Sequence, residues 1–203
     1  MLESFLDFVS PTACAVCKIP PSPLCDSCLP AFGVTKSSLE GTPVWYATEY
    51  SEPISRILTA YKDQNRTALI TYLAPGLGQA VAEAVLDLGS CSICVPPRNQ
   101  INFRKRGFDP VLSLITAGDK LALRRLPINT LRFQRQVQDQ RRLDKPERIS
   151  NILGSMKAIP GSKKVLLVDD VMTTGSTLKE CMRALGAAGY EVAGICVLAK
   201  RNI

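Results

Sequence analysis

The segment Val165–Thr177 constrains the fold of this 203-residue chain more than any other part of it. It begins with four apolar residues, Val165–Val168, which are typical of a strand buried on both faces in a parallel sheet. Two adjacent carboxylates, Asp169 and Asp170, follow that strand, and small residues then lead into a helix. Ligands of parallel sheets bind beyond the carboxyl ends of the strands. The segment therefore predicts an α/β domain with a ligand site at this edge of its sheet.

The small residues after the aspartates predict a phosphate-binding loop. A glycine with slim hydroxylated neighbours lets backbone N–H groups converge on one anion, and the helix that follows adds the positive end of its dipole. A phosphate monoester fits such a loop. The residues predicted to form it are Val171, Met172, Thr173, Thr174, Gly175, Ser176 and Thr177.

Asp169 and Asp170 are the predicted catalytic residues. Carboxylates repel a phosphate, so we expect them to hold the vicinal hydroxyls of a sugar, either directly or through a hydrated Mg²⁺. The alternative is an apolar strand followed by an ordinary capped helix. Two carboxylates at a buried strand end are costly unless a ligand uses them, which favours the binding site. A Walker-type loop is excluded, because the chain has no Gly-x-x-x-x-Gly-Lys segment.

The stretch Val168–Thr177 resembles the phosphoribosyl pyrophosphate (PRPP) signature of type I phosphoribosyltransferases. Within that superfamily the chain is most similar to the ComF family, the competence protein F type. Cys14-x-x-Cys17 with Cys25-x-x-Cys28, Val95–Arg98, Arg104–Phe108 and the series Gln140, Leu143, Arg148 and Asn151 resemble further segments of that family. Asp109 stands where the family usually has asparagine. The resemblance implies a parallel-sheet, type I phosphoribosyltransferase-like domain over residues 43–203, binding PRPP or another 5-phosphoribosyl compound with Mg²⁺.

Basic residues before this signature predict the contacts of the pyrophosphate group. Arg98 follows the predicted strand Cys91–Val95, and Arg104, Lys105 and Arg106 come soon after it, with a glycine that lets the chain bend. Cations stabilise a departing pyrophosphate. The alternative for Arg104–Arg106 is a solvated, flexible turn.

No segment of the sequence specifies an acceptor, so two hypotheses stay open. The first is a Mg²⁺-dependent pentosyl transferase, a glycosyltransferase that uses PRPP. The second is a non-catalytic protein, and here the resemblance implies single-stranded DNA binding and competence-machinery partners during natural transformation. Residues 98–148 hold 13 Lys or Arg against 5 Asp or Glu, a charge of 13 − 5 = +8, compared with +7 for the whole chain. Such a field attracts phosphates of either kind of partner.

The two Cys-x-x-Cys units predict a structural zinc site within a small N-terminal module, residues 1–42. Its ligands would be Cys14, Cys17, Cys25 and Cys28. Two disulfides or free thiols are the alternatives, but the segment has so little apolar material that it needs a metal or a similar cross-link. The other cysteines, Cys91, Cys94, Cys181 and Cys196, lie in apolar surroundings and are predicted to pack in the core.

Hydrophobic periodicity gives the remaining elements. The predicted helices are Pro53–Lys62, Leu69–Leu88, Phe108–Leu123 and Thr177–Ala188, and the further strands are Val44–Tyr50, Asn129–Phe133, Gly154–Ile159 and Glu191–Leu198. Arg135–Asn151 is expected to form a loop or an exposed helix. Met1–Pro11 has the pattern of a short amphipathic helix and does not resemble a secretory signal. With no membrane span expected, the predicted location is cytoplasmic.

Overall fold

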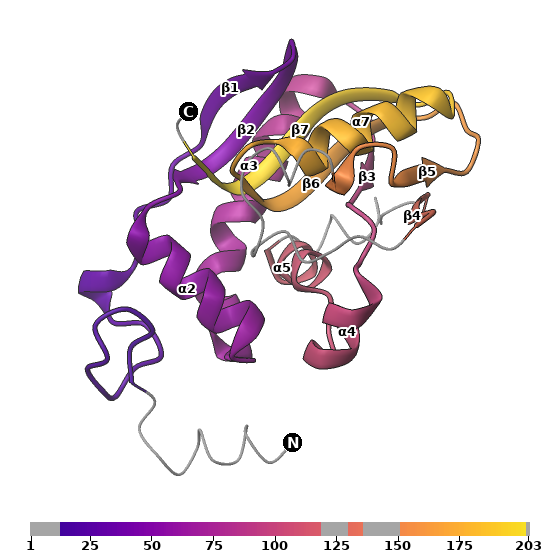
Figure 1. The fold of residues 1–203 in the computed structure, drawn as a ribbon. Helices are drawn as coiled ribbons and strands as arrows, with labels where there is room; N and C mark the ends of the chain where they lie inside the picture. The colour runs from indigo at the N-terminus through magenta and orange to yellow at the C-terminus, as the bar shows by residue number, and fades with distance from the viewer. Residues whose placement is uncertain (1–12, 119–129, 136–150, 202–203) are drawn as a thin grey trace.

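The computed structural model describes residues 13–118, 130–135 and 151–201 (Figure 1). The amphipathic helix predicted within Met1–Pro11, most of the basic stretch Arg135–Asn151 and the last residues of the helix Phe108–Leu123 lie outside the described residues.

A mostly parallel sheet forms the centre of the molecule. Its strand order is β1-β2-β7-β6-β3, and only the edge pair β1 and β2 is antiparallel. Because β2, β7, β6 and β3 run in one direction, their carboxyl ends meet at one edge of the sheet, as the sequence predicted. The bounds are β1 Thr35–Leu39, β2 Thr42–Glu49, β3 Ser92–Cys94, β6 Lys164–Met172 and β7 Glu191–Lys200.

Helices cover both faces of this sheet (Figure 1). The apolar sides of α2, α3 and α5 pack on one face, and α7 packs on the other. The bounds of these helices are α2 Glu52–Asp63, α3 Ile70–Leu88, α5 Pro110–Gly118 and α7 Ser176–Ala187; a short helix, α4, spans Gln100–Arg106, and two 3₁₀ turns span Asp26–Cys28 and Thr67–Leu69.

Successive side chains of strand β6 point alternately into the two halves of the core, one on each face of the sheet. Val165 and Leu167 point toward α7, while Leu166 and Val168 point toward α3 and α5. All four side chains are fully buried, as expected for a strand between two helical layers. The structure thus confirms the α/β fold class with its mostly parallel sheet.

Strand β6 is longer than the sequence predicted. It continues through both aspartates to Met172, because Asp169 and Val171 still pair with Val197 and Ala199 of β7. The carboxylates therefore belong to the last part of the strand and not to the loop after it.

Two predicted strands form a separate small sheet. β4 (Leu131–Phe133) and β5 (Met156–Ala158) pair antiparallel, and neither joins the central sheet. Leu131 and Met156 pack with the residues of α7. The buried carboxylate of Glu180 accepts a hydrogen bond from Met156 N at 2.8 Å, so this small sheet is attached to α7.

Strand β1 was not expected from the sequence, which placed residues 35–39 with the cysteine segment. Thr35–Leu39 is polar and lies at an edge of the sheet with only half-buried and exposed side chains, so no apolar alternation marks it. It nevertheless belongs to the central sheet through its pairing with β2.

Helix α3 lies in the core of the domain. Among the described residues one stretch, Thr67–Leu88, is apolar and long enough to cross a membrane by length and composition, whereas the sequence had suggested no such run. Half of its apolar window is buried inside the fold. Gly78 of α3 and Gly118 of α5 allow close contact between the two helices, since a Cβ added at Gly118 would lie 2.3 Å from Ala74 O.

Candidate functional site

A cavity of about 140 Å³ lies beyond the carboxyl ends of β3 and β6. Its walls come from the turn after β3, from α4, from the start of α5 and from the end of β6. The residues that line it are Pro96, Pro97, Arg98, Asn99, Asn102, Phe103, Arg106, Phe108, Asp109, Pro110, Val111, Asp169 and Asp170. The cavity therefore brings together the twin aspartates and two of the four predicted basic residues.

Asp169 and Asp170 leave β6 toward opposite faces of the sheet, yet both reach the cavity. Burial, together with the neighbouring charge of Asp170, raises the pKa of Asp169 from 3.8 to about 8. Asp169 Oδ1 accepts a hydrogen bond from the backbone N–H of Asp170 at 2.8 Å. Asp170 is 8% exposed and forms an ion pair with Lys62 of α2. One acid thus has a cationic partner, and its neighbour favours the protonated form.

The loop after β6 turns sharply at Gly175. Gly175 has φ 72°, in the left-handed region, and it is the residue that precedes the first turn of α7. A Cβ at this position would also lie 2.9 Å from Leu39 Cδ1 of β1. The backbone conformation favours glycine here, and a larger residue would also have to displace the end of the Leu39 side chain. The loop is consequently fixed between β6 and the β1–β2 hairpin.

The predicted loop residues do not all present their side chains in the same way. Thr173, Thr174 and Thr177 are half-buried, and the hydroxyls of Thr174 and Ser176 hydrogen-bond each other at 3.0 Å. The side chain of Met172 is buried in the core beside α7. Val171 packs with the core on the opposite face. These last two residues can offer a ligand only backbone atoms.

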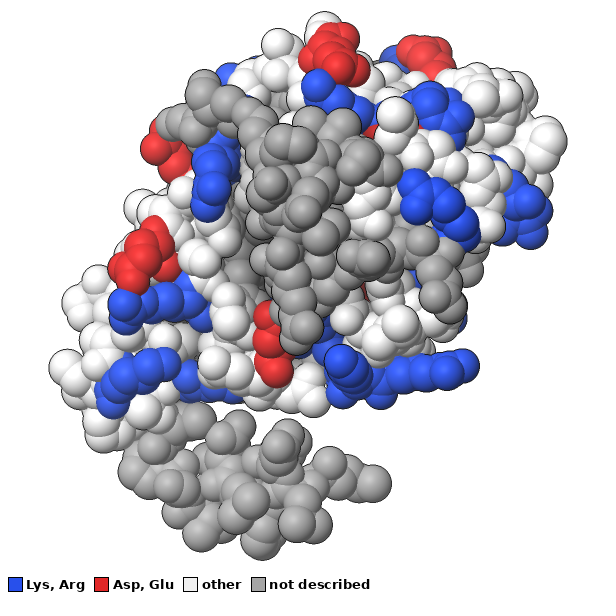
Figure 2. All heavy atoms as spheres, in the orientation of Figure 1, with Lys and Arg blue, Asp and Glu red and all other residues white. Residues whose placement is uncertain are grey.

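The basic residues divide into an inner and an outer pair. The Arg98 guanidinium lies 4.2 Å from the centre of the Phe103 ring, a cation–π contact that leaves its N–H edges available for an anion. Arg106 also lines the cavity, and its Nη2 donates to Asp63 Oδ1 of α2 at 2.8 Å. Arg104 and Lys105 are exposed on α4 and do not line the cavity. Figure 2 shows Lys and Arg side chains over much of this face, with one group at the lower right, where α4 lies in Figure 1.

The basic cluster Arg104–Arg106 lies in a helix, and not in the flexible turn that was the alternative from the sequence. Asn99 caps α4, because its side-chain oxygen accepts hydrogen bonds from Ile101 N and Asn102 N at 3.0 and 3.2 Å. Gly107 ends the helix in the left-handed conformation, φ 76°. An asparagine two residues before an apolar position and a glycine after the basic run are the signals that could have predicted α4.

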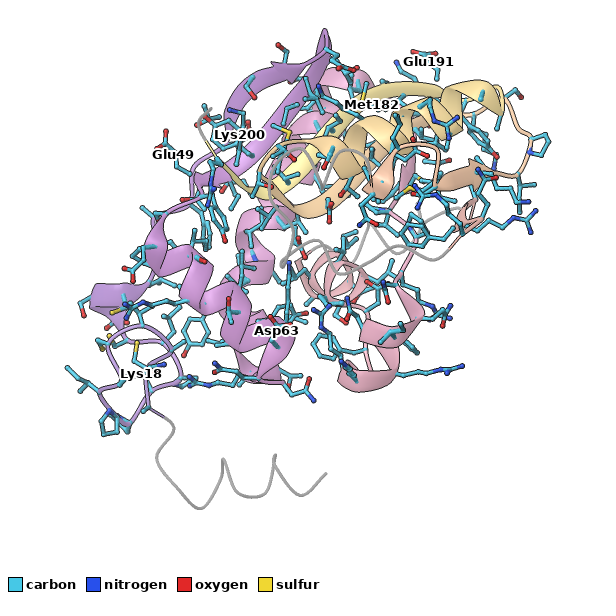
Figure 3. All side chains as sticks on the ribbon, in the orientation of Figure 1. Lys18, Glu49, Asp63, Met182, Glu191 and Lys200 are labelled. Carbon is cyan, nitrogen blue, oxygen red and sulfur yellow. The ribbon has the colours of Figure 1, made fainter. Side chains whose placement is uncertain are left out.

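Sequence reasoning missed several cavity residues. Asp109 caps α5, with its Oδ1 accepting from Leu112 N at 3.1 Å, and it places a third carboxylate in the cavity wall. Phe103 and Phe108 supply aromatic surface. Lys62 and Asp63 belong to no sequence motif. Their contacts with Asp170 and Arg106 arise because the fold places the end of α2 beside the cavity wall (Figure 3).

The four cysteines of the N-terminal segment form one cluster. The Sγ atoms of Cys14, Cys17, Cys25 and Cys28 lie within 4.8 Å of one another. Cys25 Sγ is 3.7 Å from both Cys14 Sγ and Cys17 Sγ. Sulfur atoms bound to one tetrahedral metal at about 2.3 Å are about 3.8 Å apart. The cluster therefore fits a metal ion such as zinc.

The pKa values of the thiols reflect how closely the four cysteines lie together. Although burial raises the pKa of Cys14, backbone hydrogen bonds from Cys25, Cys17 and Val16 lower it to about 6. The hydrogen bond with Cys25 and burial raise the pKa of Cys28 to about 12. Four thiolates in such close contact require a cation to neutralise them.

The cysteine segment packs against α2 and α3. Cys14, Ala15 and Leu24 are buried in the same core cluster as the residues of these helices. Arg66 donates to Ala13 O at 2.5 Å and to Pro23 O at 3.3 Å, so the chain just after α2 holds both sides of the segment.

The candidate site thus combines a mostly parallel sheet, an aspartate pair at the end of a central strand and a glycine turn into the next helix. Residues 126–203 match the phosphoribosyl transferase domain family. This match includes β6, the loop and α7, and the predicted signature Val168–Thr177 lies within it.

Two curated proteins are similar to a short part of the chain. An adenine phosphoribosyltransferase of Clavibacter michiganensis subsp. michiganensis (strain NCPPB 382) is 62% identical over 39 residues, which is 19% of this chain and 22% of that protein. The adenine phosphoribosyltransferase of Clavibacter sepedonicus is 62% identical over 39 residues, 19% of this chain and 20% of its own length. The chain thus spans about a fifth of the length of the curated relatives it matches.

Proposed function

We propose that this chain is a PRPP-binding, phosphoribosyltransferase-like protein of the ComF type. The observation that carries the proposal is the continuous unit of β6, Gly175 and α7, which puts Asp169 and Asp170 next to a helix N-terminus at the sheet edge. The phosphoribosyl transferase domain match over this unit supports it. A 5-phosphate accepts hydrogen bonds from the backbone of residues 173–177, and the ribose hydroxyls donate to the two carboxylates.

The pyrophosphate group fits the opposite wall of the cavity. Arg98 and Arg106 line that wall, and each is already oriented, by Phe103 and by Asp63 respectively. In a transfer reaction positive charge develops on the ribose ring while pyrophosphate departs, and the two arginines stabilise the departing group. A Mg²⁺ ion that arrives with the pyrophosphate would supply further charge neutralisation. Asp109, where the ComF family usually has asparagine, adds an acid near this path and favours an accompanying metal.

The cysteine cluster is proposed to hold one structural zinc ion. All four positions are taken by protein thiolates, so no coordination site is left for a substrate. The role of the ion would be to fold the segment that packs on α2 and α3.

A second candidate function is single-stranded DNA binding. The exposed Arg104 and Lys105 on the outer side of α4 favour it, because they are separated from the cavity and free of its charge balance. Few aromatic side chains accompany them, so backbone phosphates would be the main contacts. Competence-machinery proteins would be the partners of such a function, in the cytoplasm.

Calorimetry with PRPP and Mg²⁺ tests the proposed binding. Wild-type protein is expected to bind, whereas Asp169→Ala combined with Asp170→Ala is expected to lose all measurable binding and to keep its zinc content. Equal affinity of the two proteins would rule out the assigned site. Release of pyrophosphate with a panel of nucleobases distinguishes a transferase from a binding protein.

A further inference from the structure

The end of α2 contacts three separate parts of the cavity wall through three consecutive residues. The hydroxyl of Tyr61 donates to Pro110 O at 3.1 Å. Lys62 forms an ion pair with Asp170, and Asp63 accepts from Arg106 at 2.8 Å. None of the three lines the cavity itself. Each of the three α2 residues instead contacts a residue that lines the cavity. Figure 3 shows Asp63 on the side of α2 that faces α4.

The pair of Lys62 and Asp170 differs from the surface ion pairs of this protein. The side chains of Lys62 and Asp170 are 20% and 12% exposed, whereas those of the pair Lys36 and Asp87 are 60% and 41% exposed. Charges removed from water in this way interact strongly, and loss of one partner leaves the other without compensation. The Lys62 ammonium is therefore a fixed part of the acid pair.

We propose that Lys62 is a positioning residue that serves as the built-in counter-cation of the ribose-binding acids. This inference rests on the proposed function. With Lys62 bonded to Asp170, the oxygens of the two adjacent acids can accept hydrogen bonds from ribose hydroxyls before any metal is present. A free divalent cation would have to compete with the Lys62 ammonium for Asp170, so Asp170 would bind such a cation only weakly in the absence of a ligand.

This role gives Lys62 two effects that a purely structural contact would not combine. Removal of its charge would loosen Asp170 and weaken the binding of ribose 5-phosphate in the absence of metal. The same removal would leave two neighbouring acids with less positive charge nearby, and these acids would then bind a free divalent cation more tightly. The two affinities are thus expected to change in opposite directions.

The experiment compares wild-type protein with Lys62→Met, which keeps the length of the side chain and removes the charge. Binding of ribose 5-phosphate without metal is measured by calorimetry, and binding of Mn²⁺ alone by electron paramagnetic resonance. Lys62→Met is expected to bind ribose 5-phosphate roughly tenfold more weakly and Mn²⁺ roughly tenfold more tightly. Lys62→Arg, which keeps the charge, is expected to restore most of both. Lys36→Met is the matched control and should leave both affinities unchanged.

The results distinguish an error in the proposed function from an error in the role of Lys62. If wild-type protein binds neither ribose 5-phosphate nor PRPP, the proposed function is wrong. If wild-type protein binds and Lys62→Met has unchanged affinity for either ribose 5-phosphate or Mn²⁺, the role given to Lys62 is wrong while the proposed function stands. If Lys62→Met does not fold, Lys62→Gln takes its place. Its affinities for ribose 5-phosphate and for Mn²⁺ then test the role of Lys62 in the same way.

Discussion

At the residue scale, the candidate site centres on two adjacent acids with different surroundings. Asp170 has its charge balanced by Lys62, while burial raises the pKa of Asp169 to about 8. A buried carboxyl group with a strongly raised pKa beside a charged neighbour is typical of functional sites. The sequence identified both acids, since two carboxylates after an apolar strand are conspicuous, but it contained no sign of their partner on α2.

The raised pKa of Asp169 predicts how stability depends on pH. The folded protein holds a proton at Asp169 up to about pH 8, whereas the unfolded chain releases it near pH 3.8. The folded state thus binds more protons between these values, so the contribution of Asp169 to stability is present below about pH 4 and is lost as the pH rises to about 8. Asp169→Asn removes this loss. Without ligand, the Tm of the wild type should fall relative to that of Asp169→Asn by at least about 3 °C between pH 5 and pH 8.5.

Thermal unfolding followed by circular dichroism at the two pH values measures this difference, and other titrating groups cancel because both proteins contain them. A constant gap between the two Tm values across this range would show that Asp169 is not protonated in the folded protein.

At the element scale, small residues determine how closely the helices approach. A methyl group at Gly118 would meet Ala74 O at 2.3 Å, so α5 would have to move away from α3. Gly118→Ala is expected to destabilise the protein by about 2 kcal/mol, which lowers the Tm by roughly 5 °C. Gly186 of α7 has no heavy atom within 4 Å of the added Cβ, and Gly186→Ala should stabilise by about 0.5–1 kcal/mol. Differential scanning calorimetry of both variants tests the pair; equal Tm values would contradict the close contact.

The stability of the cysteine segment is expected to depend on the metal ion proposed to bind its four thiolates. Cys25→Ser is expected to abolish zinc binding, because Cys25 lies 3.7 Å from two other ligand sulfurs. The loss should lower the Tm by roughly 5–10 °C, since Leu24 and Ala15 would no longer be held against α2 and α3. The control Cys94→Ala removes a buried thiol outside the cluster and should keep about one zinc per chain. Metal analysis of reduced wild-type protein, prepared without chelator, tests the proposed zinc site. Absence of zinc would refute it.

The success of sequence reasoning also varied by element. Strongly periodic or wholly apolar segments such as α3 and the first part of β6 were predicted closely. Strand β1 was missed because a polar edge strand has no periodicity, and α4 was missed because its cap and its glycine were not considered together. The contacts of Lys62 and Asp63 connect α2 with β6 and α4, elements that are distant in sequence. Such contacts depend on tertiary packing, which a single sequence does not reveal.

At the scale of the whole molecule, α4 separates two kinds of basic surface. Arg98 and Arg106 lie on the inner side with the acids of the cavity, and Arg104 and Lys105 lie on the outer side. A net charge of +7 attracts polyanions in general, so charge alone cannot identify the partner. The two sides can be separated by mutation.

Two double variants are expected to separate single-stranded DNA binding from PRPP binding. Arg104→Ala with Lys105→Ala should weaken single-stranded DNA binding and lower its salt slope by about 1 for each lost phosphate contact, with PRPP affinity unchanged. Arg98→Ala with Arg106→Ala should weaken PRPP binding by at least about tenfold. Fluorescence anisotropy over a series of salt concentrations and calorimetry provide the two measurements. Loss of both ligands in both variants would mean that one surface binds both.

A crystal structure of the complex with PRPP and Mg²⁺ tests the central claim most directly. The account predicts the 5-phosphate among the backbone N–H groups of residues 173–177, the ribose hydroxyls on Asp169 and Asp170, and the pyrophosphate beside Arg98 and Arg106. Density for PRPP anywhere else on the protein, or a phosphate placed away from the start of α7, would contradict it.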